Sequence, residues 1–205
     1  MDGRATPVTR ASAEIPATRD RILAAALAAF ADRGVAGTSL DSVAAGVGVR
    51  KQTLLYWFPS KDQLLFGVVD HAVADLGSRL GQAAVGAGPS LDRRLVAVVD
   101  ATFRLGTTNP ELLAVVREVA RLGPPASTHL VAAVGPLVDL AASALAAGPT
   151  DRERVRRLLL AAGARVVGMV TEAEVRADLG LPADLAWLRA RRRALLDSLA
   201  TDLTP

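Results

Sequence analysis

The side chains best suited to binding chemistry stand in a short polar run. Arg50, Lys51, Gln52 and Thr53 follow one another directly and combine two cations with groups that donate and accept hydrogen bonds. Such side chains can pair with base edges and phosphates in a duplex groove. The run therefore predicts contact with a nucleic acid, although an exposed run of this kind is otherwise ordinary solvated surface.

Two residues that follow this run have side chains suited to binding a phosphate group. Tyr56 offers a phenol at the height where a phosphate would lie, and Lys61 stands in the first turn of a helix whose free N–H groups favour an anion. Lys61 and Lys51 are also the only two lysines among the 24 cationic residues of the chain. We expect all of these side chains to share one surface.

A pair of short helices must position this surface. Residues 40–58 predict two helices joined by a tight turn at Gly48, where a positive φ favours glycine. Val43, Val47, Val49 and Leu54 would face a common core, and the second helix would present its leading edge outward. This is the helix-turn-helix pattern.

Composition excludes several other classes of protein. The chain has 205 residues, 51% of them hydrophobic, with a net charge of +3 and no cysteine. Disulfides and thiolate metal sites are therefore excluded, and two histidines are too few for a metal site. No glycine loop follows a strand, so we expect no cofactor, no metal and no catalytic residues. We also expect no signal peptide, no membrane-spanning run and a cytoplasmic location.

Helical periodicity recurs along the whole chain, and no strand pattern appears. Caps and glycine breaks predict an all-α protein of about nine helices. We expect a flexible N-terminal arm over residues 1–17, a three-helix DNA-binding domain over 18–62, and a larger helical domain over 63–205. Gly34 should end the first helix of the DNA-binding domain.

Residues 18–66, TRDRILAAALAAFADRGVAGTSLDSVAAGVGVRKQTLLYWFPSKDQLLF, resemble the DNA-binding domain of the tetracycline-repressor (TetR) family. The resemblance implies a homodimer that binds a palindromic double-stranded operator, and a C-terminal domain that binds a small molecule and thereby releases DNA. It places Arg50, Lys51, Gln52 and Thr53 at base-reading positions, and Thr38, Tyr56 and Lys61 at phosphate contacts. The alternative is a helical small-molecule-binding protein or an activator.

Three positions depart from the family pattern. Arg50 stands where a serine commonly caps the recognition helix, so a cap is lost and a cation gained. Leu55 replaces a tyrosine that often touches phosphate, and Trp57 replaces a histidine. We expect a weaker phosphate clamp on one side, with Trp57 in the core.

The last two helices, over about 150–173 and 184–202, are the predicted dimer interface. One apolar stripe comprises Val155, Leu158, Leu159, Ala162, Val166, Met169 and Val170. The other comprises Leu185, Leu188, Leu195, Leu196 and Leu199. Alternatively, both stripes face the core of a single subunit.

A small-molecule pocket would lie among the C-terminal helices, lined by aliphatic side chains and a few polar groups. The candidate ligand-binding residues are Phe103, Arg104, His129, Asp139, Arg165 and Met169. Asp100 and Arg104 are spaced for an ion pair along one helix.

Overall fold

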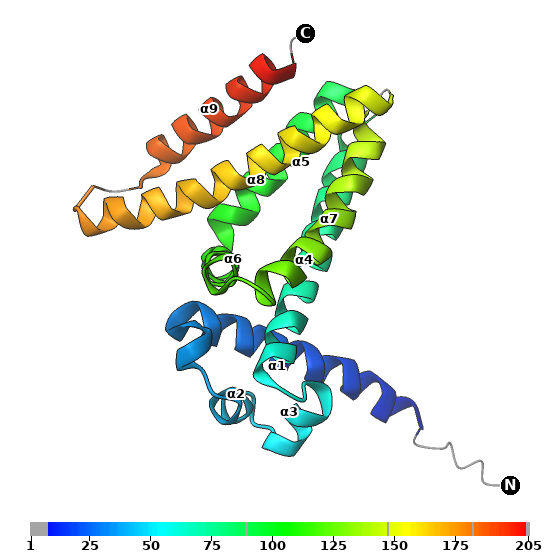
Figure 1. Cartoon of the computed structure of the whole chain (residues 1–205), viewed down its shortest axis with the longest axis vertical. Helices are drawn as coiled ribbons and strands as arrows, with labels where there is room; N and C mark the ends of the chain where they lie inside the picture. The colour runs from blue at the N-terminus through cyan, green and yellow to red at the C-terminus, as the bar shows by residue number, and fades with distance from the viewer. Residues whose placement is uncertain (1–7, 89, 147, 182, 204–205) are drawn as a thin grey trace, which may run out of the picture. The chain divides into compact units, whose positions relative to one another are not determined.

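The computed structural model describes residues 8–88, 90–146, 148–181 and 183–203, and all regular structure in these ranges is helical (Figure 1). This confirms the all-α prediction. The helices are α1 (Val8–Gly37), α2 (Leu40–Val47), α3 (Lys51–Trp57), α4 (Lys61–Gly86), α5 (Leu91–Thr108), α6 (Pro110–Leu122), α7 (Ala126–Leu145), α8 (Pro149–Asp178) and α9 (Leu185–Leu203).

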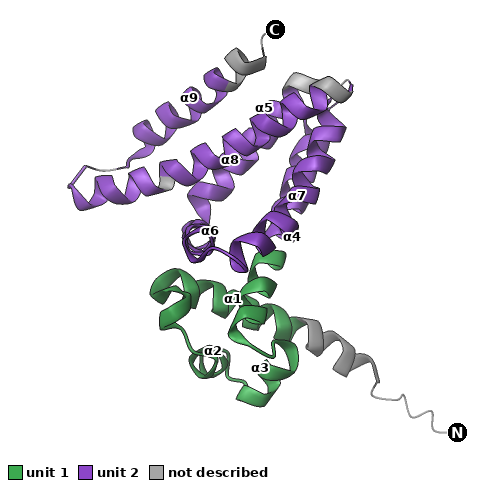
Figure 2. Cartoon of the chain, viewed as in Figure 1, with its two compact units in different colours: residues 1–71 green, residues 72–205 purple. Residues whose placement is uncertain are grey.

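The chain forms two compact units, Met1–His71 and Ala72–Pro205 (Figure 2). The boundary between the two units along the chain falls within α4, so one continuous helix belongs to both. The sequence placed the boundary at 62/63 instead, in the first turn of this helix.

Helix α1 differs from expectation at its start and agrees with it near its end. It begins at Val8, so residues 8–17, expected to be part of a flexible arm, are helical; residues 1–7 lie outside the described residues. Alanine and glutamate within this segment favour a helix. Gly34 has φ 69° and ψ 168°, which interrupts the helix at the predicted residue.

The turn between α2 and α3 has the geometry that the sequence predicts. Ser39 caps α2 and forms a capping box with Ser42. Gly48 ends α2 in the left-handed region, with φ 75°, where other residues are strained. Arg50 occupies the cap position of α3 and makes no side-chain cap bond, as its departure from serine implies.

An aliphatic core with two phenylalanines holds the first unit together. Gly67 on α4 lets Phe58 approach closely, because a Cβ there would lie 2.5 Å from Phe58 Cε1. The Arg19 guanidinium lies over the same ring, 5.7 Å from its centroid. The buried residues of this core are Ile22, Leu23, Ala26, Phe30, Val43, Ala44, Val47, Leu54, Phe58, Leu64, Leu65 and Val68.

In the second unit, the predicted dimer stripe of α8 faces the core of its own subunit. The buried members are Val155, Leu158, Ala162, Val166 and Met169, which pack with residues of α5, α6, α7 and α9. On α9, Leu195 belongs to the same core, whereas Leu185 is exposed. The side chains of Val170 and Leu199 lie outside the described residues. A dimer interface on α8 must therefore use a different face of that helix.

Two bidentate ion pairs tie the helices of this unit together. Arg192 on α9 donates to both oxygens of Asp100 on α5, at 2.9 and 2.6 Å. The expected partner, Arg104, is exposed, and Asp100 pairs with Arg192 instead. Arg117 on α6 donates to both oxygens of Glu174 on α8, at 2.5 and 2.6 Å. These bonds lower the pKa of Glu174 below its ordinary value.

Helix α7 differs from the expectation that no run of the chain is long and apolar enough to span a membrane. Among the described residues it is the one helix that is long and apolar enough to cross a membrane, with 20 residues and a mean hydropathy of 1.5. Its alanines, valines and leucines are interrupted by only one charged residue, Asp139. In this structure α7 packs on α8 within the second unit.

Candidate nucleic-acid interface and ligand pocket

The leading edge of α3 is exposed, as the sequence predicts. Lys51, Gln52 and Thr53 all face solvent, whereas Leu54 directly after them is fully buried. The buried leucine anchors the helix, and the helical rotation then directs the three polar side chains outward. Together with the exposed Arg50, they form a surface that we call the reading edge (residues 50–53).

Lys51 is held on this edge by a carboxylate of the preceding helix. Its ammonium lies 2.8 Å from Asp41 Oδ2 on α2, and both side chains are about half exposed, at 49% and 64%. An exposed pair of this kind contributes little stability. Its geometric effect is to restrain the lysine between α2 and α3, beside the reading edge.

Tyr56 lies at the end of α3 and is 79% exposed. Its ring meets Trp57 edge to face, with centroids 5.3 Å apart and planes at 82°. Trp57 is half-buried and only partly in the core where it was expected. The tryptophan thus fixes the tyrosine ring from one side and leaves the phenol in solvent, where it can reach a phosphate.

Thr38 is not an exposed contact, although the family resemblance places it at a phosphate. It is 2% exposed, and its hydroxyl lies 2.9 Å from the Gly34 carbonyl oxygen and 3.0 Å from that of Ala29. The hydroxyl therefore satisfies carbonyls left open where Gly34 interrupts α1. Its side chain fixes the entrance to α2 from inside the unit.

Lys61 is also engaged within the first unit. Its ammonium donates to the carbonyl oxygens of Val35 at 2.8 Å, Thr38 at 3.1 Å and, more weakly, Ala36 at 3.4 Å. We call this arrangement the lysine clamp. A cation on these carbonyls is favoured by the partial negative charge at the end of α1. The clamp joins α4 to the α1–α2 connection and uses the donors that were predicted to meet phosphate.

An arginine acts in the same way at the end of α2. One terminal nitrogen of Arg21 on α1 donates to the Val47 carbonyl oxygen at 2.7 Å. The sequence analysis did not single out this residue, because the contact joins positions 26 apart along the chain. It braces the turn that presents the reading edge.

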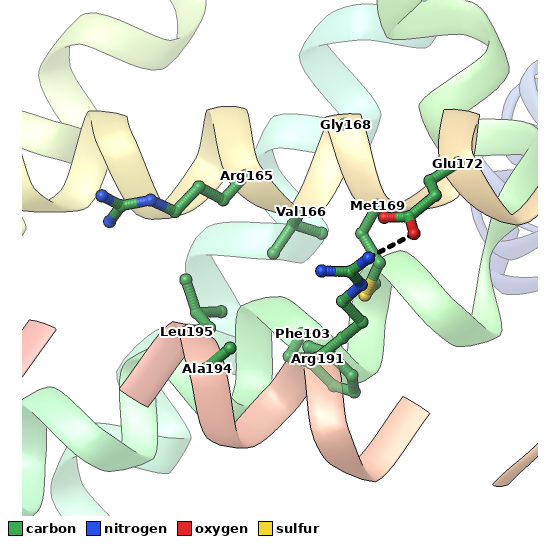
Figure 3. A pocket seen from close by; sticks show the side chains of 9 residues that line it. All are labelled: Phe103, Arg165, Val166, Gly168, Met169, Glu172, Arg191, Ala194 and Leu195. Atoms are coloured by element: carbon green, nitrogen blue, oxygen red, sulfur yellow. Dashed lines mark hydrogen bonds and ion pairs between the residues drawn. The ribbon is translucent and has the colours of Figure 1, made fainter. Parts of the chain in front are cut away.

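The second unit contains an open pocket of about 320 Å³ between α5, α8 and α9 (Figure 3). Phe103, Val166, Met169 and Leu195 are buried and form an apolar floor. The rest of the lining is Arg165, Gly168, Glu172, Arg191 and Ala194. Three of the predicted ligand-binding residues, Phe103, Arg165 and Met169, are thus brought together.

The other three predicted ligand-binding residues do not line this pocket. Arg104 is exposed on α5, and His129 is half-buried on α7. Asp139 is exposed and pairs with Arg156 on α8 at 3.2 Å, so it does not point inward. His129 and Asp139 stand on α7, which contributes no residue to the lining of this pocket, and Arg104 is on α5 but is not among the lining residues.

Sequence reasoning missed the contribution of α9 to the pocket. Arg191 pairs with Glu172 across it, and Arg191 lies over the Trp187 ring, 5.7 Å from the centroid. The sequence analysis did not single out Arg191. Its spacing of one helical turn from Trp187 was the available signal for a role in the pocket.

The N-terminal part of the chain matches a known family. Residues 22–68 match the family described as "Bacterial regulatory proteins, tetR family". The HTH-type transcriptional regulator RutR of Escherichia coli (strain K12) is 43% identical over 58 residues, which cover 28% of this chain and 27% of that protein. The chain therefore matches about a quarter of the length of this curated relative.

Solved structures share the fold of the whole chain. A tetR family regulator from Shewanella sp. PV-4 has a TM-score of 0.63 at 22% identity, over 87% of this chain and 95% of that one. The regulator FadR from Bacillus subtilis, in complex with stearoyl-CoA, has a TM-score of 0.70 at 15% identity, over 90% and 99%. Residues 22–68 therefore belong to the helix-turn-helix region of the tetR family of bacterial regulatory proteins, and the chain shares the fold of solved regulators over most of its length.

Proposed function

We propose that the chain is a ligand-responsive transcriptional regulator that represses by binding a palindromic operator as a homodimer. The observation that carries the proposal is the exposed reading edge, four consecutive polar side chains anchored by the buried Leu54. The family match over residues 22–68 supports it. A cytoplasmic location follows from contact with bacterial DNA, and the function requires no catalytic step.

The residues of the edge have separate roles in this proposal. Gln52 and Thr53 contact base edges, because amide and hydroxyl groups both donate and accept. Arg50 and Lys51 supply positive charge to guanine or phosphate, and Tyr56 donates to a phosphate. Thr38 and Lys61 act indirectly, by holding α1, α2 and α4 in place.

The homodimer would use the outward faces of α8 and α9. Leu160 and Val175 are each about half exposed on α8, and Leu185 is exposed on α9. Between the two α8 residues, a Cβ added at Gly163 would meet nothing within 4 Å, so a partner helix could approach closely. A dimer would hold two reading edges about 34 Å apart, or a multiple of it, which matches successive turns of a duplex.

A ligand response is supported by the pocket of the second unit. The pocket exceeds the lower limit of about 300 Å³ that is usual for small-molecule sites. The fold is shared with a regulator, FadR of Bacillus subtilis, whose structure contains stearoyl-CoA. We infer that a small molecule bound to the second unit releases the operator.

Selection of bound sequences from a random duplex pool tests this function. The full-length protein should enrich a palindrome, and a Gln52→Ala variant should enrich a different one. Gln82→Ala is the matched control, because Gln82 is exposed on α4 in the second unit. Equal affinity for all duplexes, or identical selected sequences for the parent and Gln52→Ala, would refute the proposed docking.

A further inference from the structure

The pocket between α5, α8 and α9 has two chemically distinct parts. Its floor consists of buried apolar side chains, with Phe103 and Met169 at its centre. Its polar side chains are two arginines, Arg165 and Arg191, and one carboxylate, Glu172. The lining therefore combines an apolar surface with one arginine–glutamate ion pair and a second guanidinium.

Arg191 is oriented for a second anionic partner. One terminal nitrogen of its guanidinium pairs with Glu172, and the other end points toward the side of the pocket lined by Arg165 and Leu195 (Figure 3). A guanidinium has five N–H donors in a planar fork, so one carboxylate leaves donors for another. The ring of Trp187 supports the guanidinium from one face and restrains it.

Two carboxylates on helices that line the pocket are each paired with an arginine of α9. Asp100 on α5 accepts two hydrogen bonds from Arg192. Glu172 on α8 is paired with Arg191. Arg165 lies at the edge of the pocket and extends along α8 away from Arg191 (Figure 3).

We propose that this pocket binds a small amphipathic carboxylate. Its apolar tail would cover Phe103 and Met169, and its carboxylate would accept hydrogen bonds from Arg191. The pocket volume of about 320 Å³ limits the ligand to a short tail. This inference rests on the proposed ligand response, and it names the site and the chemical class of that ligand.

Binding of such a ligand would connect α8 with α9. Val166 and Met169 come from α8, whereas Arg191 and Leu195 come from α9. A molecule that contacts both helices stabilises the arrangement in which they lie together. Because the outward faces of the same helices are the proposed dimer interface, the ligand could influence the spacing of two reading edges through them.

Tail-matched probes test the ligand class directly. The full-length Trp57→Phe protein keeps Trp187 as its only tryptophan, and Arg191 lies against that ring. Fluorescence titrations with octanoate, octan-1-ol and octylammonium would compare a negative, a neutral and a positive head group on the same alkyl tail. Octanoate should bind at least about tenfold more tightly than the alcohol, since charge-assisted hydrogen bonds are stronger than neutral ones. The amine should bind more weakly than either.

Two variants locate the binding. Arg191→Gln should remove the preference for octanoate and leave octanol binding unchanged. Gly168→Leu should weaken both probes, because Gly168 lines the pocket and a Cβ there meets no atom within 4 Å. Gly81→Leu on α4 is the control, since its Cβ is equally unobstructed and it does not line the pocket.

Equal affinities for octanoate and octanol, or octanoate binding that Gly168→Leu leaves intact, would overturn the assignment. Operator binding without any probe tests the regulator separately. A protein that binds its operator and ignores octanoate disproves only the ligand class. A protein that binds octanoate in this pocket and no DNA disproves only the proposed function.

Discussion

The two lysines of this chain should have opposite effects when each is replaced by methionine. Both belong to the first unit, and methionine keeps most of the apolar stem while it removes the charge. Lys61→Met breaks the lysine clamp on the α1–α2 connection. Lys51→Met breaks one exposed ion pair with Asp41 and removes a cation from the reading edge. We expect the first change to lower stability and the second to lower DNA affinity.

The contacts of the two lysines determine how much each replacement should lower the free energy of unfolding. The lysine clamp has two bonds of good length, 2.8 Å to Val35 and 3.1 Å to Thr38, both partly buried. Hydrogen bonds to charged groups contribute roughly 1.5–3 kcal/mol each before solvent competition, so Lys61→Met should cost about 2–3 kcal/mol. The exposed pair of Lys51 should contribute about 0.2–1 kcal/mol. The expected difference in unfolding free energy is thus about 2 kcal/mol.

Urea unfolding followed by fluorescence measures this difference in the first unit. In a Trp187→Phe background, Trp57 is the only tryptophan, so the signal reports on the first unit. With a slope of about 1–2 kcal/mol per molar for a unit of this size, Lys61→Met should lower the midpoint by about 1–3 M. Below that midpoint its DNA affinity should stay close to that of the parent.

The reverse pattern would refute the structural role of Lys61. Lys61 would be a phosphate contact if Lys61→Met kept the parent's urea midpoint while the slope of log operator affinity against log salt concentration became shallower by about one unit. Lys51→Met is the variant for which we expect that loss of slope. It should unfold close to the parent's midpoint.

Three further outcomes are expected. Gly67→Ala should destabilise the first unit by roughly 1–3 kcal/mol through overpacking, whereas Gly46→Ala, at an unobstructed helix position, should stabilise it by about 0.5–1 kcal/mol; urea unfolding measures both. Because the pKa of Glu174 is lowered from its ordinary value of 4.5, its ionised carboxylate stabilises the fold at pH values above 4.5. This contribution is lost as the pH falls through the lowered pKa. Glu174→Gln should therefore cost about 0.5 kcal/mol at pH 7 and nothing at pH 2, in unfolding at each pH. Asp41→Asn should tighten operator binding in the parent and have a smaller effect in a Lys51→Met background, as a double-mutant cycle by fluorescence anisotropy would show; equal effects in both backgrounds would mean that the carboxylate does not act through the lysine.

Local features of the fold could be predicted because they depend on residues close in sequence. Gly34 and Gly48 interrupt or end helices with positive φ where the sequence placed breaks. Ser60 and Asp184 have residue types that favour helix caps, and they accept bonds from the backbone N–H groups three residues later. The exposed reading edge follows from the same short-range periodicity.

Contacts between distant segments could not be predicted from those patterns. Thr38 and Lys61 have the residue types of phosphate contacts, but their partners are backbone carbonyl oxygens of the first unit. Asp100 pairs with Arg192 across 92 positions instead of with a neighbour on its own helix. The pocket likewise needs α9 beside α8, which periodicity alone does not fix. Sequence patterns indicate which faces are apolar, and packing decides which partner each face meets.

The lysine clamp also bears on why this chain, which draws nearly all its positive charge from arginine, has a lysine at position 61. Three carbonyl oxygens converge there on a single nitrogen, and a tetrahedral ammonium presents three hydrogens around one atom. A guanidinium spreads its hydrogens over a flat fork and cannot match that convergence. Arginine at position 61 would conserve charge and lose the fit, while position 51, with one carboxylate partner, would accept either residue.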